Sequence, residues 1–170
     1  MRLPLLRHLV SVAVLPFTMT VLVPRWILGG VPAPRAGDGA LAVAAQLAGV
    51  AALALGLALF ASSLRRFAAE GEGTLAPWDP PRALVVRGPY RYVRNPMISG
   101  VLFVLVGEAL VLLSRDLAWW AALFAAVNVV QIPLVEEPML ERRFGDAYRE
   151  YRRHVPRFVP RLRPWEPGAA

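Results

Sequence analysis

The sequence MISGVLFVLVGEALVLLSRDLAWWAALFAAVNVVQIPLV, residues 97–135, decides the fold of this chain. It contains two apolar segments, Met97–Leu113 and Leu117–Val135, which are joined by the polar residues 114–116. About 20 apolar residues in a helix cross the hydrocarbon core of a bilayer, so the second segment is long enough and the first is slightly short. Because so short a connection forces two helices to run antiparallel, we expect a membrane-spanning helical hairpin.

The two ends of this hairpin are expected to form one mouth. In an antiparallel hairpin, residues at equal distance from the turn lie at a similar depth. With the turn centred on Arg115, Glu136 returns to the level of Arg94, and Glu137 returns to the level of the residue before it. We therefore expect residues 94–96 to meet the paired glutamates to within about one helical turn.

Two further apolar segments precede the hairpin, Leu9–Val23 and Leu41–Ala61. Soluble helices of this length carry a polar face, so membrane helices are favoured over the buried helices of a soluble bundle. Arg2 and Arg7 stand before the first segment, which leaves a signal peptide as an alternative there. The expected fold class is all-α, a polytopic membrane helical bundle of four transmembrane helices with a cytoplasmic C-terminal helix.

The placement of arginine predicts the orientation of these helices. Six Arg lie between the second and third apolar segments and eight follow the fourth, whereas Arg115 stands alone between the third and fourth. Basic residues are retained on the cytoplasmic side, so both termini are expected in the cytoplasm. Basic residues also attract anionic membrane lipids, whereas the acids mixed among the C-terminal Arg argue against a nucleic-acid partner.

The composition excludes several kinds of chemistry. Of the 170 residues, 56% are hydrophobic and 18% are charged, which is typical of neither a disordered chain nor an ordinary soluble domain. All 19 basic residues are Arg, so Lys-dependent catalysis is excluded, and the absence of Cys excludes a thiolate nucleophile. His8 and His154 are too few for an all-His zinc site, and no metal centre is expected.

The chain divides into three regions. Residues 1–66 hold the N-terminal pair of transmembrane helices, residues 67–96 form a cytoplasmic connection, and residues 97–170 combine the hairpin with a C-terminal segment as the expected binding core. A connection as long as 67–96 without regular structure is usually functional or a linker. The C-terminal segment is expected to be helical from about Glu137 to Arg153 and extended over Val155–Pro160, where two Pro interrupt a helix.

The mouth of the hairpin combines groups that suit a zwitterionic ligand with an aromatic base. Adjacent carboxylates repel each other and need cations nearby, for which Arg94, Arg91 and Arg142 are available. Tyr90 and Tyr92 offer flat aromatic surfaces. A Pro at the start of the third apolar segment leaves first-turn N–H groups free for an anion. The alternative interpretation is a solvated helix end with a surface ion pair.

Four motifs lie around this mouth: GPYRYVRNPMISG at 88–100, EE at 136–137, FGDAYREY at 144–151 and VPRF at 155–158. As a linked set, they resemble the isoprenylcysteine carboxyl methyltransferase family, and the related membrane phospholipid N-methyltransferases share parts of them. The resemblance covers about residues 82–160. The Arg-only, Ala-rich composition indicates a GC-rich genome. The resemblance is to a bacterial-type member, which is expected in the inner (plasma) membrane.

The resemblance implies a polytopic methyltransferase that uses S-adenosylmethionine. Such enzymes bind this cofactor at the cytoplasmic ends of the hairpin, covered by the C-terminal segment, and take a lipid-like substrate from the bilayer. The residues that fall on cofactor-binding positions, or are hypothesised to contact the cofactor, are Ala83, Leu84, Val85, Tyr90, Arg94, Asn95, Pro96, Ile98, Glu136 and Glu137. Glu136 and Glu137 are hypothesised to hold the ammonium or ribose hydroxyls, and Arg94 or the first-turn N–H groups the carboxylate. Arg94 and Glu137 are also the candidates for positioning the reacting groups.

Two departures from the family pattern concern the ligands. Many relatives have Tyr at the position of Ile98, so one cofactor contact is either lost or supplied by Tyr92. The eukaryotic carboxyl methyltransferases have an Arg about one turn before the paired glutamates, and this chain has Gln131–Pro133 there. The methyl acceptor is therefore left open among a lipid-like or isoprenoid carboxylate, amine or thiol.

Two other functions compete with methyl transfer. A catalytically silent relative would act as a membrane scaffold or binding protein; the departure at Ile98 favours it, and the retained glutamate pair opposes it. A small four-helix transporter would use the intramembrane acid Glu108 for coupling, but it would have no use for the long cytoplasmic segments. The sequence does not indicate an oligomeric state.

Overall fold

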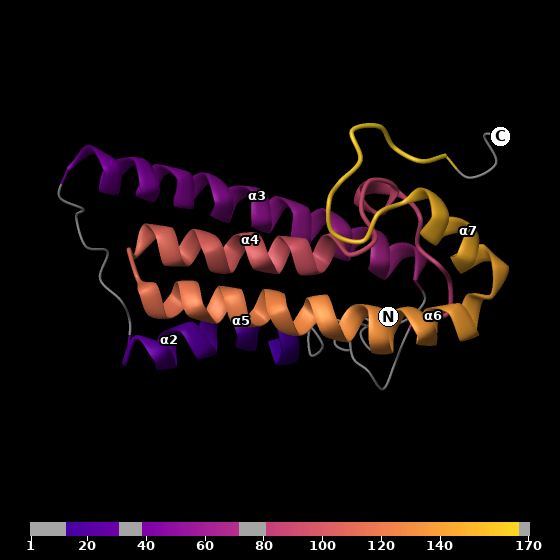
Figure 1. The fold of residues 1–170 in the computed structure, drawn as a ribbon, viewed down its shortest axis with the longest axis horizontal. Helices are drawn as coiled ribbons and strands as arrows, with labels where there is room; N and C mark the ends of the chain where they lie inside the picture. Colours follow the sequence, from indigo (N-terminus) through magenta and orange to yellow (C-terminus); the bar gives the residue numbers. More distant parts are fainter. Residues whose placement is uncertain (1–12, 31–38, 72–80, 167–170) are drawn as a thin grey trace.

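The computed structural model describes residues 13–30, 39–71 and 81–166 (Figure 1). These described residues form helices and no β-strand, which confirms the predicted all-helical class for this part of the chain. The helical elements are η1 (Ala13–Leu22), α2 (Val23–Ile27), α3 (Ala40–Glu70), η2 (Gly88–Arg91), α4 (Pro96–Val111), α5 (Arg115–Gln131), η3 (Ile132–Glu136), α6 (Glu137–Phe144) and α7 (Asp146–His154). Arg2, Arg7 and the start of the first apolar segment lie outside the described residues.

The predicted hairpin is formed by α4 and α5, which lie side by side (Figure 1). Ser114 precedes α5, and its Oγ accepts a hydrogen bond from the N–H of Leu117 at 3.3 Å. This cap satisfies one of the free donors at the start of α5 and fixes the short turn. Between the helices lies a small apolar core of Val101, Leu105 and Ala121.

Glycines hold α3 directly against α4. A Cβ placed on Gly56 would lie 2.7 Å from the carbonyl oxygen of Gly100, and a Cβ on Gly49 would lie 2.9 Å from that of Gly107. Both glycines of each helix are spaced by one heptad, so they fall on one face of that helix. Small residues at such positions let two helix backbones approach closely without a hydrophobic driving force, as in membrane helix pairs.

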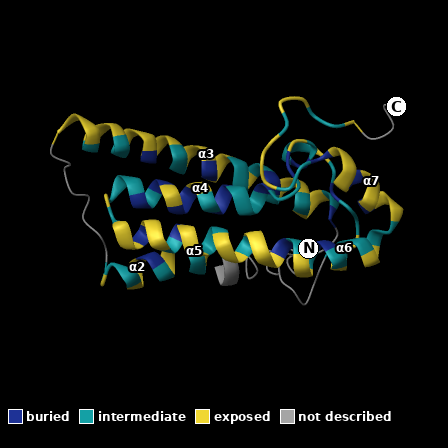
Figure 2. Ribbon diagram, viewed as in Figure 1, coloured by how far each residue is buried: buried dark blue, intermediate teal, exposed yellow. Residues whose placement is uncertain are grey.

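Two helical stretches are long and apolar enough to cross a membrane, Ala40–Glu70 and Arg115–Phe144. Only 11% of the apolar window of each is buried inside the protein, so most of their apolar side chains face outward (Figure 2). A core helix of a soluble protein would be mostly buried. α4 is shorter, and the first predicted segment is described only from Ala13 onward. The described helices thus supply two of the four predicted membrane spans by length and composition.

The C-terminal helix differs from its prediction. Two helices, α6 and α7, occupy the range predicted as one helix. The chain breaks at Gly145, whose φ of +56° and ψ of −128° are disfavoured for residues with a side chain. The range is helical as predicted, but the expectation of one C-terminal helix is wrong, because Gly145 adopts a positive φ that interrupts the helix. Beyond α7, the chain is non-helical over the predicted extended range Val155–Pro160.

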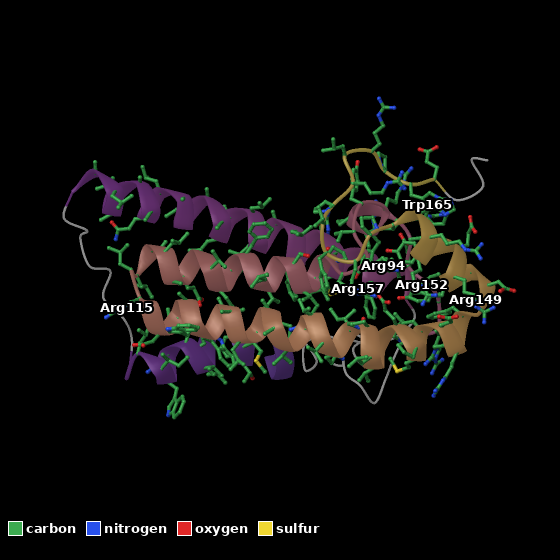
Figure 3. All side chains as sticks on the ribbon, in the orientation of Figure 1. Arg94, Arg115, Arg149, Arg152, Arg157 and Trp165 are labelled. Atoms are coloured by element: carbon green, nitrogen blue, oxygen red, sulfur yellow. The ribbon has the colours of Figure 1, made fainter. Side chains whose placement is uncertain are left out.

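Labelled basic side chains mark the two ends of the hairpin (Figure 3). Arg115 lies at the turn between α4 and α5, whereas Arg94, Arg152 and Arg157 lie at the opposite end with α6 and α7. That opposite end is the one predicted to be cytoplasmic. It also brings together residues from the connection before α4 and from the segment after α7.

Candidate functional site

A cavity of about 580 Å³ lies at this end of the molecule. Its walls come from η1, the second half of α3, residues 81–85, the start of α4, the rod formed by α5, η3 and α6, and α7. Apolar side chains make up most of the wall. The residues that carry polar side-chain groups are Tyr90, Arg94, Asn95, Asn128, Gln131, Glu136, Tyr148 and Tyr151. A largely apolar wall with a few convergent polar groups is the usual composition of a small-molecule site.

Nine of the ten predicted cofactor-binding residues line this one cavity. They are Ala83, Leu84, Val85, Tyr90, Arg94, Asn95, Pro96, Ile98 and Glu136. They come from three separate parts of the chain, and the fold brings them together. Their individual roles toward a cofactor stay predictions. The tenth residue, Glu137, does not line the cavity.

A widened helical turn gives the two adjacent glutamates different surroundings. In η3 the N–H of Glu137 donates to the carbonyl oxygen of Ile132, five residues earlier. Pro133 begins this turn, and a proline inside a helix has no N–H to donate and crowds the carbonyl four residues before it. Glu136 lines the cavity, whereas Glu137 is buried beside it. Such single widened turns occur frequently at functional sites.

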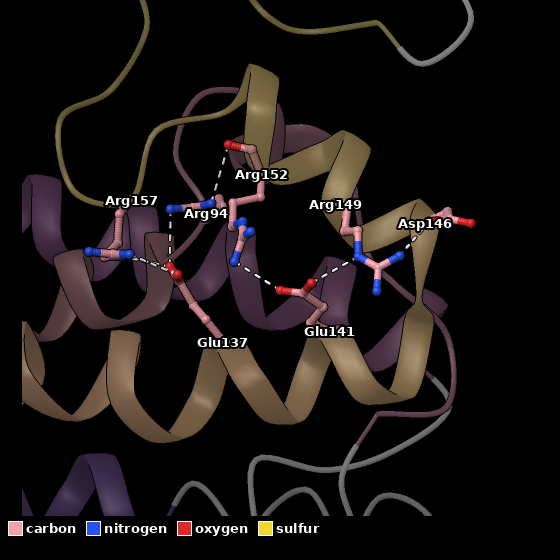
Figure 4. Close-up of polar contacts among 7 residues, drawn as sticks. All are labelled: Arg94, Glu137, Glu141, Asp146, Arg149, Arg152 and Arg157. Carbon is pink, nitrogen blue, oxygen red and sulfur yellow. Dashed lines mark hydrogen bonds and ion pairs between the residues drawn. The ribbon is translucent and has the colours of Figure 1, made fainter.

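Glu137 binds two guanidinium groups (Figure 4). Its Oε1 lies 3.0 Å from Nη2 of Arg94 and accepts a hydrogen bond from Nε of Arg157 at 2.6 Å, and its Oε2 accepts from Nη2 of Arg157 at 2.7 Å. A buried carboxylate requires such compensation, because removing an unpaired charge from water is costly. The ion pair confirms the prediction that Arg94 and the glutamate pair meet at the mouth of the hairpin.

The other predicted counter-charges lie elsewhere. Arg91 forms an ion pair with Glu166 at 2.6 Å, and Arg142 is exposed. Arg157, which was not among the predicted counter-charges, compensates Glu137 instead. The sequence feature that could have indicated Arg157 is the VPRF motif, in which Pro156 cannot continue α7 and the next residue is Arg157.

Residues 155–166, here called the C-terminal strap, run alongside the segment before α4. The N–H of Arg94 donates to the carbonyl oxygen of Pro156 at 2.9 Å, and the N–H of Arg161 donates to that of Tyr92 at 2.9 Å. Nδ2 of Asn95 also donates to the carbonyl oxygen of Arg157 at 3.3 Å. These bonds fix the strap against the residues that introduce α4, next to the cavity.

Buried tyrosines form the wall between α7 and the segment before α4. The hydroxyl of Tyr151 donates to the carbonyl oxygen of Tyr90 at 2.7 Å. Burial raises the pKa of Tyr148 to about 12, with a further contribution from the charge of Glu137. Burial likewise raises the pKa of Tyr90 and of Tyr151. All three side chains are therefore protonated near neutral pH and act as neutral hydroxyl groups, not as bases.

Both charged side chains that line the cavity carry a group with no partner among the described residues. Among the described residues, Glu136 forms no hydrogen bond or ion pair, although it is partly buried. The Nε of Arg94 is buried and has no hydrogen-bond partner. Buried polar groups are normally satisfied, and one carboxylate beside one N–H donor is complementary to a ligand that carries both an ammonium and a carboxylate. The donor set of the cavity thus fits a zwitterion.

The phospholipid methyltransferase family model matches residues 44–147, more than half of the chain. The chain belongs to the phospholipid methyltransferase family. The match extends from α3 into α7, so it includes all ten predicted cofactor-binding residues. The predicted relationship to membrane methyltransferases is confirmed at this level. No curated protein sequence and no solved structure shows significant similarity to this phospholipid methyltransferase family member.

Proposed function

We propose that the chain is an S-adenosylmethionine-dependent methyltransferase embedded in the membrane, with a lipid-like or isoprenoid carboxylate, amine or thiol as its acceptor. One observation carries this proposal. Nine residues selected from the sequence for cofactor binding line a single cavity, inside the region that matches the phospholipid methyltransferase family.

The polar groups of the cavity fit the two charged ends of an amino-acid moiety. Glu136, which has no partner among the described residues, would hold the ammonium. The unpartnered Nε of Arg94 and the first-turn N–H groups of α4 would hold the carboxylate. Apolar residues 83–85, beside Tyr90, would pack against the adenine. S-adenosylmethionine supplies a methyl group on a sulfonium centre, which is already activated for displacement.

The protein would then bind and orient the two reacting groups and exclude water from the site. Alignment of two reacting groups contributes up to about 7–11 kcal/mol to catalysis. Arg157 would hold the carboxylate of Glu137 in place, and the ion pair with Glu137 would fix the position of the Arg94 side chain. A carboxylate or thiolate acceptor needs no general base, whereas an ammonium has to lose a proton before it attacks.

The apolar half of the cavity supports a lipid-like acceptor. Met19 of η1, Phe60 of α3 and Phe124 of α5 line it, and α3 and α5 expose apolar faces outside the cavity. We further propose four membrane spans with both termini in the cytoplasm of a bacterial cell, in the inner membrane. The position of Arg115 at one end of the hairpin and of Arg94, Arg152 and Arg157 at the opposite end supports this orientation (Figure 3), and the two apolar helical stretches support a membrane location.

Calorimetric binding of S-adenosylmethionine and S-adenosylhomocysteine to the purified protein in lipid nanodiscs tests the cofactor. Glu136→Gln removes the charge proposed to hold the ammonium, and it should weaken binding by about tenfold or more, equivalent to about 1.4 kcal/mol. Asp146→Asn is the matched control, because this carboxylate lies at the same end of the molecule but not at the cavity. No binding by folded wild-type protein, or equal binding by both variants, would contradict the assignment.

Transfer is tested separately with a methyl-labelled donor and a total lipid extract. Label in an extracted lipid supports the enzyme, and the mass of that lipid identifies the acceptor. Cofactor binding without transfer of the labelled methyl group to any lipid in the extract would instead support the catalytically silent relative.

A further inference from the structure

The outer bend of the C-terminal strap exposes apolar side chains that no described element covers. Leu162 is 100% exposed and Val159 is 75% exposed, and Phe158 beside them is also exposed. Figure 2 shows this bend as an exposed loop that projects from the helices. Leu162 and Val159 lie outside both candidate membrane spans, so the spans do not account for their exposure.

Hydrogen bonds fix the depth of this bend relative to the helices. Arg161 donates its N–H to the carbonyl oxygen of Tyr92, and the carbonyl oxygen of Arg157 accepts from the side chain of Asn95. Both partners lie within four residues of Pro96 in the sequence, where the apolar helix α4 begins. The bend is therefore held near the depth where an apolar core gives way to a polar surface.

The bend is also basic. Arg161 and Arg163 flank Leu162, and residues 158–163 contain no acid. Arg163 is exposed and forms no ion pair with any residue that the structure describes. The nearest acid in the strap, Glu166, is bound to Arg91. The guanidinium of Arg161 donates from Nη1 to the carbonyl oxygen of His154 at 2.8 Å, and it forms no ion pair with any described residue. Exposed apolar side chains next to guanidinium groups that have no acidic partner are complementary to the surface of a bilayer that contains anionic lipids.

We propose that residues 158–163 form an interfacial anchor that docks on the anionic lipid surface of the membrane. Val159 and Leu162 enter the boundary between headgroups and acyl chains, and Arg161 and Arg163 contact lipid phosphates. The same strap carries Arg157, which bonds Glu137 beside the cavity. Docking therefore holds the strap in place next to the cavity, so the lipid composition affects how well the strap is ordered there.

A probe on Leu162 tests the insertion. The chain contains no Cys, so Leu162→Cys provides a single attachment point for an environment-sensitive fluorophore. Asp146→Cys is the control, since this side chain is 94% exposed at the same end of the molecule. The full chain is reconstituted in vesicles of equal parts phosphatidylcholine and phosphatidylglycerol. We expect the probe at 162 to emit at shorter wavelength than at 146 and to be quenched several-fold more by a lipid spin-labelled near its headgroup.

A charge variant tests the lipid specificity. In the Leu162→Cys background, Arg163→Gln should reduce the difference in quenching between anionic vesicles and vesicles of phosphatidylcholine alone, and Arg163→Lys should retain it. Arg153→Gln, a basic residue of α7 outside the bend, should leave the difference unchanged.

Two results would overturn the anchor. The first is water-like emission at 162 with no more lipid quenching than at 146. The second is shielding at 162 without lipid quenching but with energy transfer between labelled copies, which would assign the bend to a contact between two chains. Neither readout depends on cofactor binding or methyl transfer, so the anchor and the proposed function fail separately.

Discussion

The contacts of the paired glutamates give them two different roles. Glu137 is buried and compensated by Arg94 and Arg157, whereas Glu136 lines the cavity without a partner among the described residues. Removal of one partner from a buried ion pair is destabilising, because it leaves part of a charge uncompensated in a poorly solvated place. Arg157 is therefore expected to matter for stability although it lies far from Glu137 in the sequence.

Arg157→Leu removes two charge-assisted hydrogen bonds to Glu137. Because Arg94 still pairs with this carboxylate, we expect a loss of about 2 kcal/mol in the free energy of unfolding, a drop of about 4–8 °C in the thermal midpoint. Arg153→Leu is the control: this exposed side chain lies 3.8 Å from Glu150 and should change stability by less than about 0.5 kcal/mol. Equal midpoints for the two variants would contradict the role of Arg157.

The buried tyrosines predict an alkaline limit to stability. Tyr148 has a pKa of about 12 in the folded chain and an ordinary pKa of 10 when unfolded, so above pH 10 the unfolded chain loses its proton first. The contribution of Tyr148 is thus fully present below pH 10 and is lost as the pH rises toward 12. Thermal midpoints measured across this range should fall, and Tyr148→Phe should make the fall shallower. An equally steep fall in the variant would refute the assignment.

Among the helical elements, the pair α3 and α4 depends most on small residues. Gly49 and Gly56 face Gly107 and Gly100 so closely that an added Cβ would meet main-chain atoms. A flexible side chain can move aside, but a helix backbone cannot do so without separating the two helices. These glycines therefore set the distance between α3 and α4, and with it the position of the cavity wall that α3 supplies.

Gly56→Leu is expected to separate α3 from α4, at a cost of at least about 2 kcal/mol. The measurement is the yield of monodisperse protein after detergent extraction, together with the thermal midpoint. Ala58→Leu is the matched control, because Ala58 lies on the exposed face of the same helix. Similar behaviour of the two variants would show that the close approach is dispensable.

The widened turn η3 shows where element-level prediction ends. The hairpin register placed the glutamate pair at the level of Arg94, and the ion pair confirms this. The register did not show that Glu136 and Glu137 would have different surroundings, because it assumed a regular helix up to the mouth. An extra residue in one turn around Pro133 changes the faces on which the following side chains lie.

At the scale of the whole molecule, the arrangement of the arginines predicts the topology. A Cys introduced at Arg115 should react with a membrane-impermeant maleimide added outside intact cells, whereas a Cys at Asp146 should react only after the membrane is permeabilised. The wild-type chain, which has no Cys, is the background control. Labelling of both positions from the outside would contradict two cytoplasmic termini.

The sequence by itself determined the all-helical class, the α4–α5 hairpin and the identity of nine cavity residues. A three-residue turn between long apolar segments leaves one antiparallel arrangement. The nine cavity residues followed from the resemblance of the linked motifs to a known family. The sequence also placed Arg94 near the glutamate pair, because this prediction needs only the depth of each residue along the hairpin.

The tertiary structure alone decided the partners of Glu137, the contact of the glycines across α3 and α4, and the course of the C-terminal strap. Each depends on groups far apart in sequence, and no local pattern records which face of one segment meets another. The break at Gly145 was also decided there, since a glycine permits a positive φ but does not require it. Packing selects among conformations that the chain locally allows, and this selection places Glu136 at the cavity and Glu137 beneath it.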